Sequence, residues 1–556
     1  MKNYLASKFL SYLDSINFED KGIIEVIKTK DVKFGDYTSN IAMRLTKTLG
    51  KNPMEIAEDI KTYLEANNEG DFVEVTVTNP GFVNLFLTKK LLVKTSMMFI
   101  DENYKPEFKY IKPLKINYEY VSANPTGDLH IGHARNAIVG NSTINALKYV
   151  GHNVRTEYWI NDAGVQMTNL AESVYWFFAP LVGLKFENLT DNAVSYKGEE
   201  IEDYGKQLAT EGFMPEGANE EERIESMILN CGEHFLNNIK DLLKNGLKIQ
   251  EFDNWQSEKW TLENKFGPVF EDLKSKGYVY EKENAIWVKS SDYGDEKDRV
   301  IIKSDGTYTY MAADVAYHTI KYDNGNMDLL IDLWGKDHHG YEPRMQAALK
   351  AAGLPEGKLE VDYISMVKVM KGGKEFKMSK RAGTSLRIKD ILKEMDSDVF
   401  KYFLVSKTKE QNMIIDIEEI TKQDMSNPYY YVQYANARMN QIIEKYKSKI
   451  GNVELIKEFK LLGVEESEKA LMAKMVEFED VMITMEKERE PSLILNYQKE
   501  LAQVFNTFYA ACKVVDPSNK EVSLERLNLV IALKNQFKTI FNIMSITPVE
   551  KIINKK

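Results

Sequence analysis

Apolar residues near the N-terminus recur at the spacing of an α-helix. Four of them fall on one face of the segment MKNYLASKFLSYLDSI, because side chains four residues apart lie above one another on a helix. They are Leu5, Phe9, Leu13 and Ile16. Further helices are expected near 37–49 and 53–65. The segment FVEVTVTNPGFVNLFL then alternates on either side of Asn79-Pro80-Gly81, which predicts a β-hairpin.

A different pattern begins after a join rich in proline and lysine at 104–113. KINYEYV (115–121) predicts a strand, residues 131–149 predict a helix that Gly151 ends, and VRTEYWI (154–160) predicts a second strand. Strand, helix and strand at this spacing form a βαβ unit, so the two strands should be parallel neighbours in one sheet. The pattern therefore predicts an α/β fold of the nucleotide-binding type.

The rest of the chain alternates between helical and strand patterns. Residues from about 165 to 300 are mostly helical and acidic, and we interpret them as an insertion between two halves of the sheet. The strand signal resumes at AIWVK (285–289), RVIIK (299–303) and MDLLIDLWG (327–335). After about 395 no strong strand pattern remains, and Asn427-Pro428 predicts the start of a long helical region.

The chain is long enough for three or four domains. It has 556 residues, 43 % hydrophobic and 28 % charged, and a domain typically has about 100 to 200 residues. No apolar run approaches the roughly 18 residues of a membrane helix, and the N-terminus lacks the features of a signal peptide. The chain has only two cysteines, Cys231 and Cys512, so we expect no disulfide framework, no CxxC zinc site and a reducing cytoplasm.

Charge is distributed unevenly along the chain. The net charge is −11, which by itself argues against binding a polyanion. Between Lys368 and Lys393, however, nine lysines and arginines stand against two acids, Glu375 and Asp390. A solvated surface is rarely so one-sided, so this window predicts an anionic partner.

The segment NPTGDLHIGH (124–133) lies where the first strand of the βαβ unit ends and its helix begins. Open parallel sheets bind ligands at this place, and helix N-termini attract phosphate. Gly132 leaves room for a flat ring such as adenine, and His130 and His133 share one face of the first turn, from which they can donate to phosphate oxygens. The alternative is a metal-binding HxxH pair, but two histidines do not complete a site and no HExxH glutamate lies between them.

Six of the seven histidines are clustered in the sequence. His130, His133 and His152 flank one predicted helix. His318, His338 and His339 fall within 22 residues. Because scattered surface histidines would not gather in this way, we expect both groups to face one cleft.

A second motif, KGGKEFKMSKRAG (371–383), places glycines on both sides of Lys377 and Lys380. A mobile basic loop suits a polyphosphate that is gripped only while its end group leaves. A solvated lysine-rich hairpin would be the simpler interpretation if the motif stood alone. The motif follows NPTGDLHIGH by about 250 residues, and the pair is far more specific than either part.

Together the two motifs resemble the HIGH and KMSK signatures of class I aminoacyl-tRNA synthetases. The surrounding residues resemble the arginyl-tRNA synthetase family over nearly the whole chain. The matching segments are EYVSANPTGDLHIGH (119–133), WINDAGVQM (159–167), SDGTYTYMAAD (304–314), WGKDHHGY (334–341), NPYYYVQYANAR (427–438) and GDY (35–37). Two small departures are Arg381, because KMSKR stands in place of KMSKS, and Thr384, where relatives often carry Asn.

The resemblance implies a multidomain α/β protein. Its parts would be a Rossmann-type parallel-sheet catalytic core with an inserted helical subdomain, an α+β N-terminal domain and an all-α C-terminal domain. The N-terminal domain would span 1–110 and contact tRNA, and the catalytic domain would span 111–395 with its insertion at about 165–300. A connector at 396–426 would contact the tRNA stem, and 427–556 would bind the anticodon.

The resemblance also implies a two-step reaction. The carboxylate of arginine would attack the α-phosphate of ATP, and a terminal ribose hydroxyl of tRNA would then attack the acyl carbon. The catalytic residues would be His130, His133, Lys377 and Lys380. ATP would be bound by Gly127, His130, Gly132, His133, His339, Met378, Ser379 and Lys380. Mg²⁺ would accompany ATP and not occupy a protein cage, so no structural metal is expected.

Arginine recognition needs a carboxylate, because paired N–H···O bonds distinguish a planar guanidinium from the ammonium of lysine. The resemblance places Asp314 and Tyr310 at the guanidinium, and Glu119, Ser122 and Asn124 around the rest of the amino acid. Asp314 lies in a non-acidic stretch, which favours a pocket residue over an acid on a helix surface.

In the last domain, Tyr430, Tyr434 and Arg438 are the tRNA-binding residues that we expect, since aromatic and arginine side chains stack on unpaired bases. A tyrosine stripe is more often core packing, so the prediction concerns the domain more than each side chain. The expected partners are tRNA(Arg), L-arginine and ATP, without a membrane. We expect a cytoplasmic monomer.

Other activities fit parts of these observations. A small adenylyltransferase of the HxGH type would lack the insertion and the helical tail. A non-catalytic tRNA-binding paralogue would have lost a histidine of HIGH or a lysine of KMSK, and neither is lost. A relative that is specific for another amino acid stays open.

Overall fold

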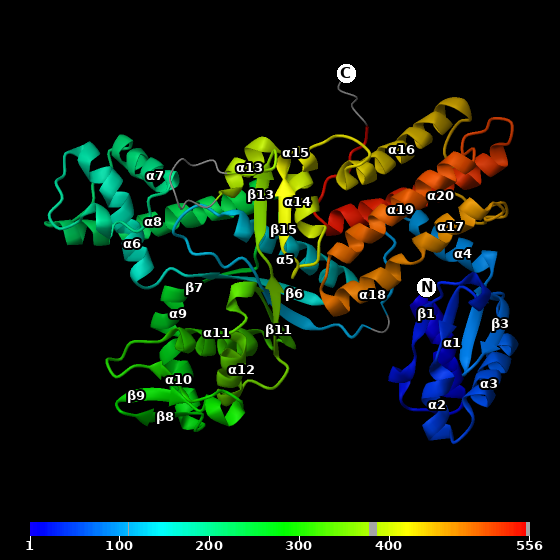
Figure 1. Cartoon of the computed structure of the whole chain (residues 1–556), viewed down its shortest axis with the longest axis horizontal. Helices are drawn as coiled ribbons and strands as arrows, with labels where there is room; N and C mark the ends of the chain where they lie inside the picture. Colours follow the sequence, from blue (N-terminus) through cyan, green and yellow to red (C-terminus); the bar gives the residue numbers. More distant parts are fainter. Residues whose placement is uncertain (109–110, 377–385, 552–556) are drawn as a thin grey trace. The chain divides into compact units, whose positions relative to one another are not determined.

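The computed structural model describes residues 1–108, 111–376 and 386–551. The chain forms two units (Figure 1): the sheet unit, Pro113–Lys422, and the helical unit, which combines Met1–Lys112 with Gln423–Lys556. Several residues of the lysine motif lie outside the described residues. They are Lys377, Met378, Ser379, Lys380, Arg381 and Thr384.

The sheet unit is built on five parallel strands in the order β12-β11-β5-β6-β7. These strands are β5 (Lys115–Glu119), β6 (Asn153–Ile160), β7 (Asn254–Ser257), β11 (Leu329–Gly335) and β12 (Leu359–Ile364). The predicted βαβ unit is confirmed, because α5 (Ile131–Val150) joins the parallel neighbours β5 and β6. Strand order reverses at β5, since β6 lies on one side of it and β11 on the other, and open sheets bind ligands at the carboxyl ends of such strands.

Helix α5 is anchored at both ends and along its length. The His130 side chain caps its N-terminus, and Gly151 ends it with φ of 112°, a conformation that strains any residue with a Cβ atom. The buried Arg135 guanidinium donates to the carbonyl oxygens of Ser365 and Gln411 at 2.9 and 2.7 Å. The helix is thereby fixed to loops that come much later in the chain.

Three helices between β6 and β7 form a core of their own. They are α6 (Val165–Phe178), α7 (Glu199–Thr210) and α8 (Glu220–Asp241). Leu170, Phe178 and Phe235 are fully buried among them, and the burial of this apolar surface stabilises the insertion. The chain then returns to the main sheet as its edge strand β7.

A separate antiparallel sheet follows, formed by β8 (Val279–Lys282), β9 (Ala285–Val288) and β10 (Arg299–Ile302). The expectation that AIWVK and RVIIK continue the main sheet is therefore wrong, and only MDLLIDLWG supplies one of its strands, β11. The reason is local, because Glu283 and Asn284 have φ of 54° and 55°, as a two-residue hairpin turn requires. β8 consequently pairs with β9.

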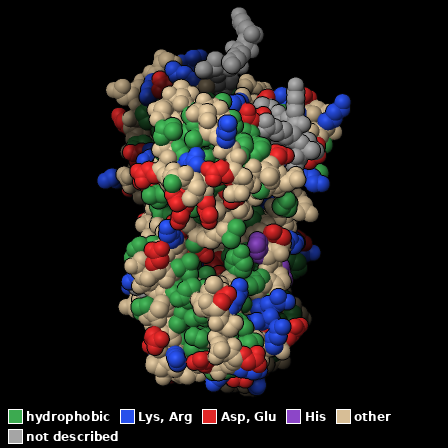
Figure 2. All heavy atoms as spheres, turned by 90° about the vertical axis from the view of Figure 1, so that its left-hand side faces the viewer, with side chains coloured by type: hydrophobic (Ala, Val, Ile, Leu, Met, Phe, Trp, Pro, Cys, Tyr) green, Lys and Arg blue, Asp and Glu red, His purple; other side chains and the backbone are tan. Residues whose placement is uncertain are grey.

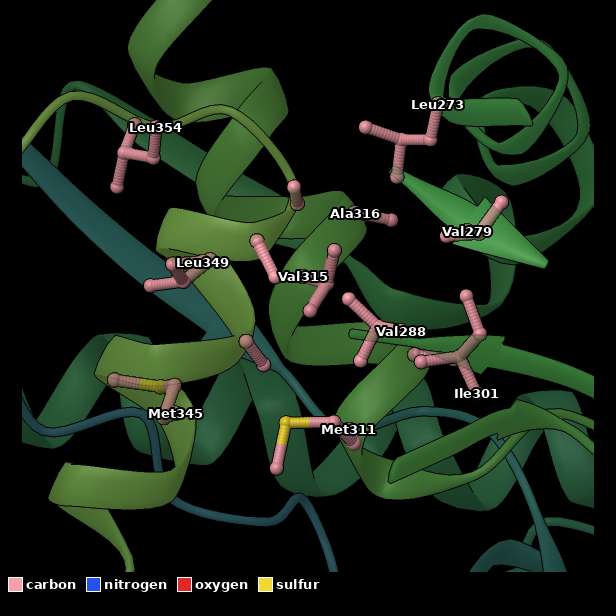
Figure 3. Packing of buried hydrophobic residues seen from close by; sticks show 14 of the residues in the cluster. Leu273, Val279, Val288, Ile301, Met311, Val315, Ala316, Met345, Leu349 and Leu354 are labelled. Atoms are coloured by element: carbon pink, nitrogen blue, oxygen red, sulfur yellow. The ribbon is translucent and has the colours of Figure 1, made fainter. Parts of the chain in front are cut away.

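The small sheet shares one apolar core with α10 (Phe266–Ser275), α11 (Tyr310–Gly325) and α12 (Glu342–Ala351), as Figure 3 shows. Leu330 of β11 belongs to the same core, so α11 is held against the main sheet. The buried residues of this core include Leu273, Val288, Ile301, Val315 and Met345.

A third sheet lies after β12. In it β13 (Val367–Lys371) pairs with β14 (Lys374–Glu375) and, in parallel, with β15 (Met413–Asp416). The expectation of no strand after about 395 is wrong, because β15 has four residues and is too short to give a periodic signal. The Asp416 carboxylate accepts from the backbone N–H groups of Gly373 at 2.9 Å and Glu418 at 3.0 Å. It thus ties the β13–β14 turn to the start of α15 (Ile417–Ile420).

In the helical unit, the N-terminal part carries a four-stranded sheet of order β1-β2-β4-β3. The hairpin predicted around Asn79-Pro80-Gly81 is confirmed as β3 and β4, which pair in antiparallel register. The elements of this part are α1 (Lys2–Ser15), β1 (Val26–Lys28), β2 (Tyr37–Ser39), α2 (Ile41–Leu49), α3 (Pro53–Ala66), β3 (Phe72–Thr78), β4 (Phe82–Leu87) and α4 (Lys89–Ser96).

The C-terminal part of the helical unit consists of long helices. Asn427 caps the first of them by accepting from the Tyr429 N–H at 3.0 Å, with Pro428 at the first helical position, as predicted. Helix α17 contacts α4, so the two ends of the chain pack together. The helices are α16 (Pro428–Lys449), α17 (Glu466–Met475), α18 (Phe478–Glu488), α19 (Ser492–Ala511) and α20 (Lys520–Ile543).

Candidate active site

A cavity of about 1710 Å³ opens at the carboxyl ends of β5 and β11. Figure 2 looks onto the sheet unit from the side of α6 and α7, and histidine side chains are visible in the hollow across the middle of this face. Nine residues that were predicted from the sequence line the cavity. They are Glu119, Ser122, Asn124, Gly127, His130, Gly132, His133, Tyr310 and Asp314.

His130 and His133 form a reciprocal cap at the N-terminus of α5. Nδ1 of His130 accepts from the Gly132 N–H at 3.2 Å, and Nδ1 of His133 accepts from the His130 N–H at 3.3 Å. The two rings stack with their centres 3.8 Å apart. The pair therefore satisfies two of the N–H groups that a helix leaves without partners at its start.

Both histidine rings are neutral in this arrangement. Burial lowers the pKa of His130, and burial together with the His130 ring lowers the pKa of His133 to about 3. A neutral imidazole has one N–H, and because each Nδ1 is an acceptor, the proton resides on Nε2. Each ring can thus donate one hydrogen bond from Nε2, as the phosphate role requires.

The loop between β5 and α5 is strained where it enters the cavity. Val121 and Ser122 have φ of 68° and 38°, a region that β-branched residues such as valine rarely adopt. Asn136 of α5 holds this turn, because its Oδ1 accepts from the Val121 N–H at 2.7 Å while its Nδ2 donates to the Leu333 carbonyl at 2.8 Å. Asn136 was not predicted from the sequence, since nothing in a helical pattern marks a residue that supports a distant turn.

Asn124 belongs to a chain of side-chain amides. It donates to Oε1 of Gln166 at 2.8 Å and accepts from Nδ2 of Asn161 at 2.8 Å. Gln166 in turn donates to the Asn161 carbonyl at 2.9 Å. The segments 119–133 and 159–167, which the sequence singled out together, are thus linked by hydrogen bonds.

Asp314 and Tyr310 lie at the start of α11. Asp314 accepts a hydrogen bond from the hydroxyl of Tyr341, and burial raises the pKa of its carboxyl group, which His318 and the Tyr341 hydroxyl lower in part. Tyr310 is 89 % exposed, so its ring stands free at the edge of the cavity. Glu258 lies near Asp314, and burial, together with Asp162 and Asp314, raises the pKa of Glu258 to about 7.

Glu119 ends β5 at the wall of the cavity. Its carboxylate forms an ion pair with Nζ of Lys321 at 2.7 Å and accepts from Oγ of Ser122 at 3.0 Å. Ser122 Oγ also accepts from the Trp159 N–H at 3.0 Å. The Ser122 hydroxyl is therefore engaged in placing Glu119.

The expectation that both histidine groups face one cleft is wrong. His130, His133 and His338 line the cavity. His152 lies buried at the far end of α5, about 30 Å away for a helix of 20 residues. The buried His318 belongs to a network behind the wall. The exposed His339 lies tilted against Tyr363 with ring centres 4.7 Å apart and does not line the cavity.

The residues that follow the lysine motif are paired with the start of α5. The Ile131 N–H donates to the Leu386 carbonyl at 3.0 Å, and the Ile388 N–H donates to the Leu129 carbonyl at 2.9 Å. Sequence reasoning missed this pairing, because it links segments that are far apart in the chain.

Arg387, between these two contacts, is a hub of ion pairs. Its guanidinium lies 2.6 Å from Asp390, 3.2 Å from Glu199 and 3.3 Å from Glu200. Glu199 and Glu200 begin α7 of the insertion and line the cavity. Arg387 therefore connects the insertion to the segment after the lysine motif.

The predicted tRNA-binding residues lie on one side of α16 in the helical unit. Tyr430 and Tyr434 have ring centres 6.3 Å apart, and the Tyr434 hydroxyl donates to the Gln423 carbonyl at 3.0 Å. Arg438 donates to Oδ1 of Asn506 at 2.8 Å. All three side chains are half-buried, whereas Tyr429 is 6 % exposed and packs in the core.

Among residues 1–108, 111–376 and 386–551, no three His, Cys, Asp or Glu side chains gather as a metal site requires. In the same described ranges, no helix combines the length and the apolar character that crossing a bilayer demands. Both cysteines are buried, and burial raises the pKa of Cys231 to about 12.

Comparisons with known proteins agree over nearly the full length. Three family models match: an arginyl tRNA synthetase N-terminal domain at residues 3–87, the catalytic domain of class I tRNA synthetases (R) at 96–448, and the DALR anticodon binding domain at 432–552. The arginine–tRNA ligase of Listeria welshimeri is 38 % identical over 535 residues, 94 % of this chain and 93 % of its own. That of Ureaplasma parvum is 38 % identical over 545 residues, 95 % of each chain. The arginyl-tRNA synthetase structure of Thermus thermophilus shares the fold, with a TM-score of 0.72 at 19 % identity over 99 % of this chain and 100 % of its own.

Proposed function

This chain belongs to the arginyl-tRNA synthetase family and is an arginine–tRNA ligase, and we propose that the cavity at the carboxyl ends of β5 and β11 holds ATP and arginine during the reaction. The observation that carries this proposal is that the cavity is lined by hydrogen-bond donors suited to phosphate and by carboxylates suited to a cationic amino acid. Neutral Nε2–H donors of His130 and His133 lie at one helix N-terminus, and the carboxylates of Glu119 and Asp314 lie on the other side of the same space.

Phosphate chemistry belongs to the α5 end of the cavity. An oxygen of the arginine carboxylate attacks the α-phosphorus of ATP, the bond to the β-phosphate bridging oxygen breaks, and pyrophosphate leaves with that electron pair. Negative charge grows on the phosphate oxygens as this happens, and donors that are already oriented stabilise it without reorganising. The His130 and His133 caps supply this orientation, and Gly127 and Gly132 leave space beside them.

Lys377 and Lys380 hold the leaving phosphates in this proposal, and Met378 and Ser379 contribute to the ATP site. Support comes from the described flanks, because Leu386 and Ile388 pair with the backbone at the start of α5. The chain that leaves the motif is therefore next to the histidine pair. Mg²⁺ enters as part of the ATP substrate, bound through phosphate oxygens.

Arginine binds at the α11 end of the cavity. The Asp314 carboxylate accepts from the guanidinium, and Tyr310 covers it from the exposed edge. Glu258 adds a second carboxyl group near Asp314. Glu119 takes the α-ammonium group, with Ser122 and Asn124 placing the surrounding loop. We assign His339, whose ring lies tilted beside Tyr363, to ATP binding on the family resemblance alone.

Transfer to tRNA uses the other parts of the chain. The attack of a terminal ribose hydroxyl on the acyl carbon releases AMP and leaves arginine esterified to tRNA(Arg). We assign 1–110 and 396–426 to contacts along the tRNA and 427–556 to the anticodon, with half-buried Tyr430, Tyr434 and Arg438 offering stacking surfaces. We further propose that the chain acts as a cytoplasmic monomer.

A stable mimic of the intermediate tests the shared cavity. Arginyl-sulfamoyl-adenosine replaces the phosphate of the adenylate by a sulfamoyl group and carries both halves of the ligand. Isothermal calorimetry should show it binding more tightly than arginine or ATP, with loss of affinity in both Asp314→Asn and His133→Asn. If one of the two substitutions leaves the affinity for the mimic unchanged, the substituted residue does not contact the ligand in the cavity.

A further inference from the structure

Behind the wall that Glu119 forms lies a buried chain of charged groups. Nζ of Lys321 lies 2.7 Å from Oε2 of Glu119 and 3.0 Å from Oδ1 of Asp332. Oδ2 of Asp332 lies 2.7 Å from Nε2 of His318. The side chains of Lys321, Asp332 and His318 are 2 to 3 % exposed, and none of these three residues lines the cavity.

The two nitrogen-bearing side chains of this network, His318 and Lys321, are fixed by α11. His318 and Lys321 project from one side of the helix, near Asp314, because residues three and four apart lie on the same face. Nδ1 of His318 faces the Asp314 carbonyl oxygen at 2.7 Å, so both ring nitrogens face oxygen atoms of neighbouring groups. Lys321 also lies 4.5 Å from the centre of the Tyr317 ring, which limits its other positions.

The negative groups around Lys321 come from three strands. Glu119 is on β5, Asp332 on β11 and Glu157 on β6, where Glu157 accepts from Nδ2 of Asn117 at 3.0 Å and from the Tyr317 hydroxyl at 3.1 Å. Burial raises the pKa of Glu119, and Lys321 opposes this shift. Although burial acts in the opposite direction, Lys321 and His318 lower the pKa of Asp332 overall. A buried carboxylate that loses its cation tends to take up a proton.

We propose that Lys321, held in place by Asp332, is a positioning residue that keeps the Glu119 carboxylate ionised and aimed into the cavity for the α-ammonium group of arginine. The proposal rests on the proposed function, in which Glu119 binds that group. Lys321 touches Glu119 from behind at Oε2, and the Ser122 hydroxyl fixes Oε1. The remaining lone pairs of the two oxygens are directed to the ligand.

The test compares arginine with 5-guanidinopentanoate, which has the same guanidinium, chain and carboxylate but no α-ammonium group. Calorimetry on the wild-type chain should show a preference for arginine. In Lys321→Met, arginine affinity should fall by about 10- to 100-fold, the range for losing one charge-assisted hydrogen bond, while the affinity for the analogue stays within about threefold. Lys321→Arg, which keeps the charge, should retain the preference. The matched control is Lys401→Met, because Lys401 is equally buried and paired with Asp398 at 2.7 Å outside the cavity.

The outcomes separate this inference from the function it rests on. If Lys321→Met does not fold, as judged by thermal unfolding, Lys321→Gln replaces it, since the amide keeps a donor without the charge. Equal losses for arginine and the analogue would reduce Lys321 to a structural role and overturn the inference. A preference that survives in Lys321→Met and Lys321→Gln but is lost in Glu119→Gln would also overturn it while leaving the site intact. A preference that survives in Glu119→Gln would instead contradict the assignment of Glu119.

Discussion

The backbone N–H of Ile131, the first residue of α5, donates a hydrogen bond to the carbonyl oxygen of Leu386 at 3.0 Å. Ile131 belongs to the HIGH segment, and Leu386 is the first described residue after the KMSK segment. The HIGH segment and the described residues that follow the KMSK segment, about 250 residues apart in the sequence, are therefore adjacent in backbone structure. This adjacency explains why the pair of motifs is informative when neither motif is specific alone.

The first prediction concerns His130 and His133. His→Asn at either position keeps an acceptor where Nδ1 was, so the helix cap is preserved, but it removes the Nε2 donor. The kcat for adenylate formation should fall by about 10² to 10³, while the KM for arginine changes little. The control is His152→Asn at the other end of α5, where Nδ1 also accepts from a backbone N–H, of Leu114 at 3.1 Å. Near-normal kcat in both cap variants would remove the phosphate role.

The second prediction concerns acid stability. The pKa of His133 is lowered by burial from 6.5 to about 3. Between these pH values the unfolded chain therefore binds a proton at this residue and the folded chain does not. Its contribution to stability is therefore present above pH 6.5 and is lost as the pH falls from 6.5 to about 3. Urea unfolding across this pH range should show that the free energy of unfolding falls less in His133→Asn than in the wild type. Equal losses would mean that the ring is accessible to protons in the folded chain.

Much of this site follows from local sequence patterns. A pattern confined to neighbouring residues can be recognised without the structure. This holds for the βαβ unit, the Asn427-Pro428 helix start and the glycine-flanked motifs. The contents of the cavity walls followed from the family resemblance, which names residues without giving their partners. Thus Glu119 was expected, but Lys321 behind it was not.

What could not be predicted depends on long-range contacts. RVIIK has a strand pattern whether it joins the main sheet or the small one, and the choice is made by its antiparallel pairing with β9, which the turn at Glu283 and Asn284 joins to β8. Arg387 resembles its basic neighbours in sequence, and only the fold brings Glu199 and Glu200 to it. His318 clusters with His338 in sequence, yet α11 directs it into the interior.

The third prediction concerns Asp314→Asn. The substitution replaces an acceptor for the guanidinium by an amide, and breaking a buried charge pair costs about 3 to 5 kcal/mol. Arginine affinity should collapse while ATP affinity is retained, as measured by calorimetry. Tyr341→Phe is the matched comparison, because it removes only the hydroxyl that donates to Asp314 and keeps the carboxyl group of Asp314. Its loss of arginine affinity should be much smaller. Arginine binding to Asp314→Asn at wild-type strength would exclude Asp314 as the specificity residue.

The fourth prediction concerns Arg387→Gln. Loss of the ion pairs to Glu199 and Glu200 should detach α7 from the segment after the lysine motif. We expect the KM for ATP to rise or the kcat to fall by about tenfold, equivalent to about 1.4 kcal/mol. Arg299→Gln is the control, since Arg299 is similarly exposed and paired with Asp295 at 2.5 Å in the small sheet. If the two variants behave alike, the Arg387 hub has no role in catalysis.

The fifth prediction concerns the order of assembly. Asp416 joins the β13–β14 turn, which leads into the lysine motif, to α15, which leads towards the C-terminal helices. Binding energy from tRNA can therefore be used to organise the site, as in induced fit. Arginine-dependent pyrophosphate exchange should be negligible without tRNA and appear when cognate tRNA is added. A chain that ends near Thr421 should gain nothing from tRNA, and robust exchange in RNA-free enzyme would show that the site is already organised.

The most direct test of the whole account is aminoacylation of unfractionated tRNA with each of the standard amino acids in turn, using ATP and Mg²⁺. The account predicts that arginine alone is esterified to tRNA, in an amount set by the tRNA(Arg) present, and that Asp314→Asn abolishes this charging. Charging with a different amino acid, or undiminished charging by Asp314→Asn, would contradict the assignment of this cavity to arginine.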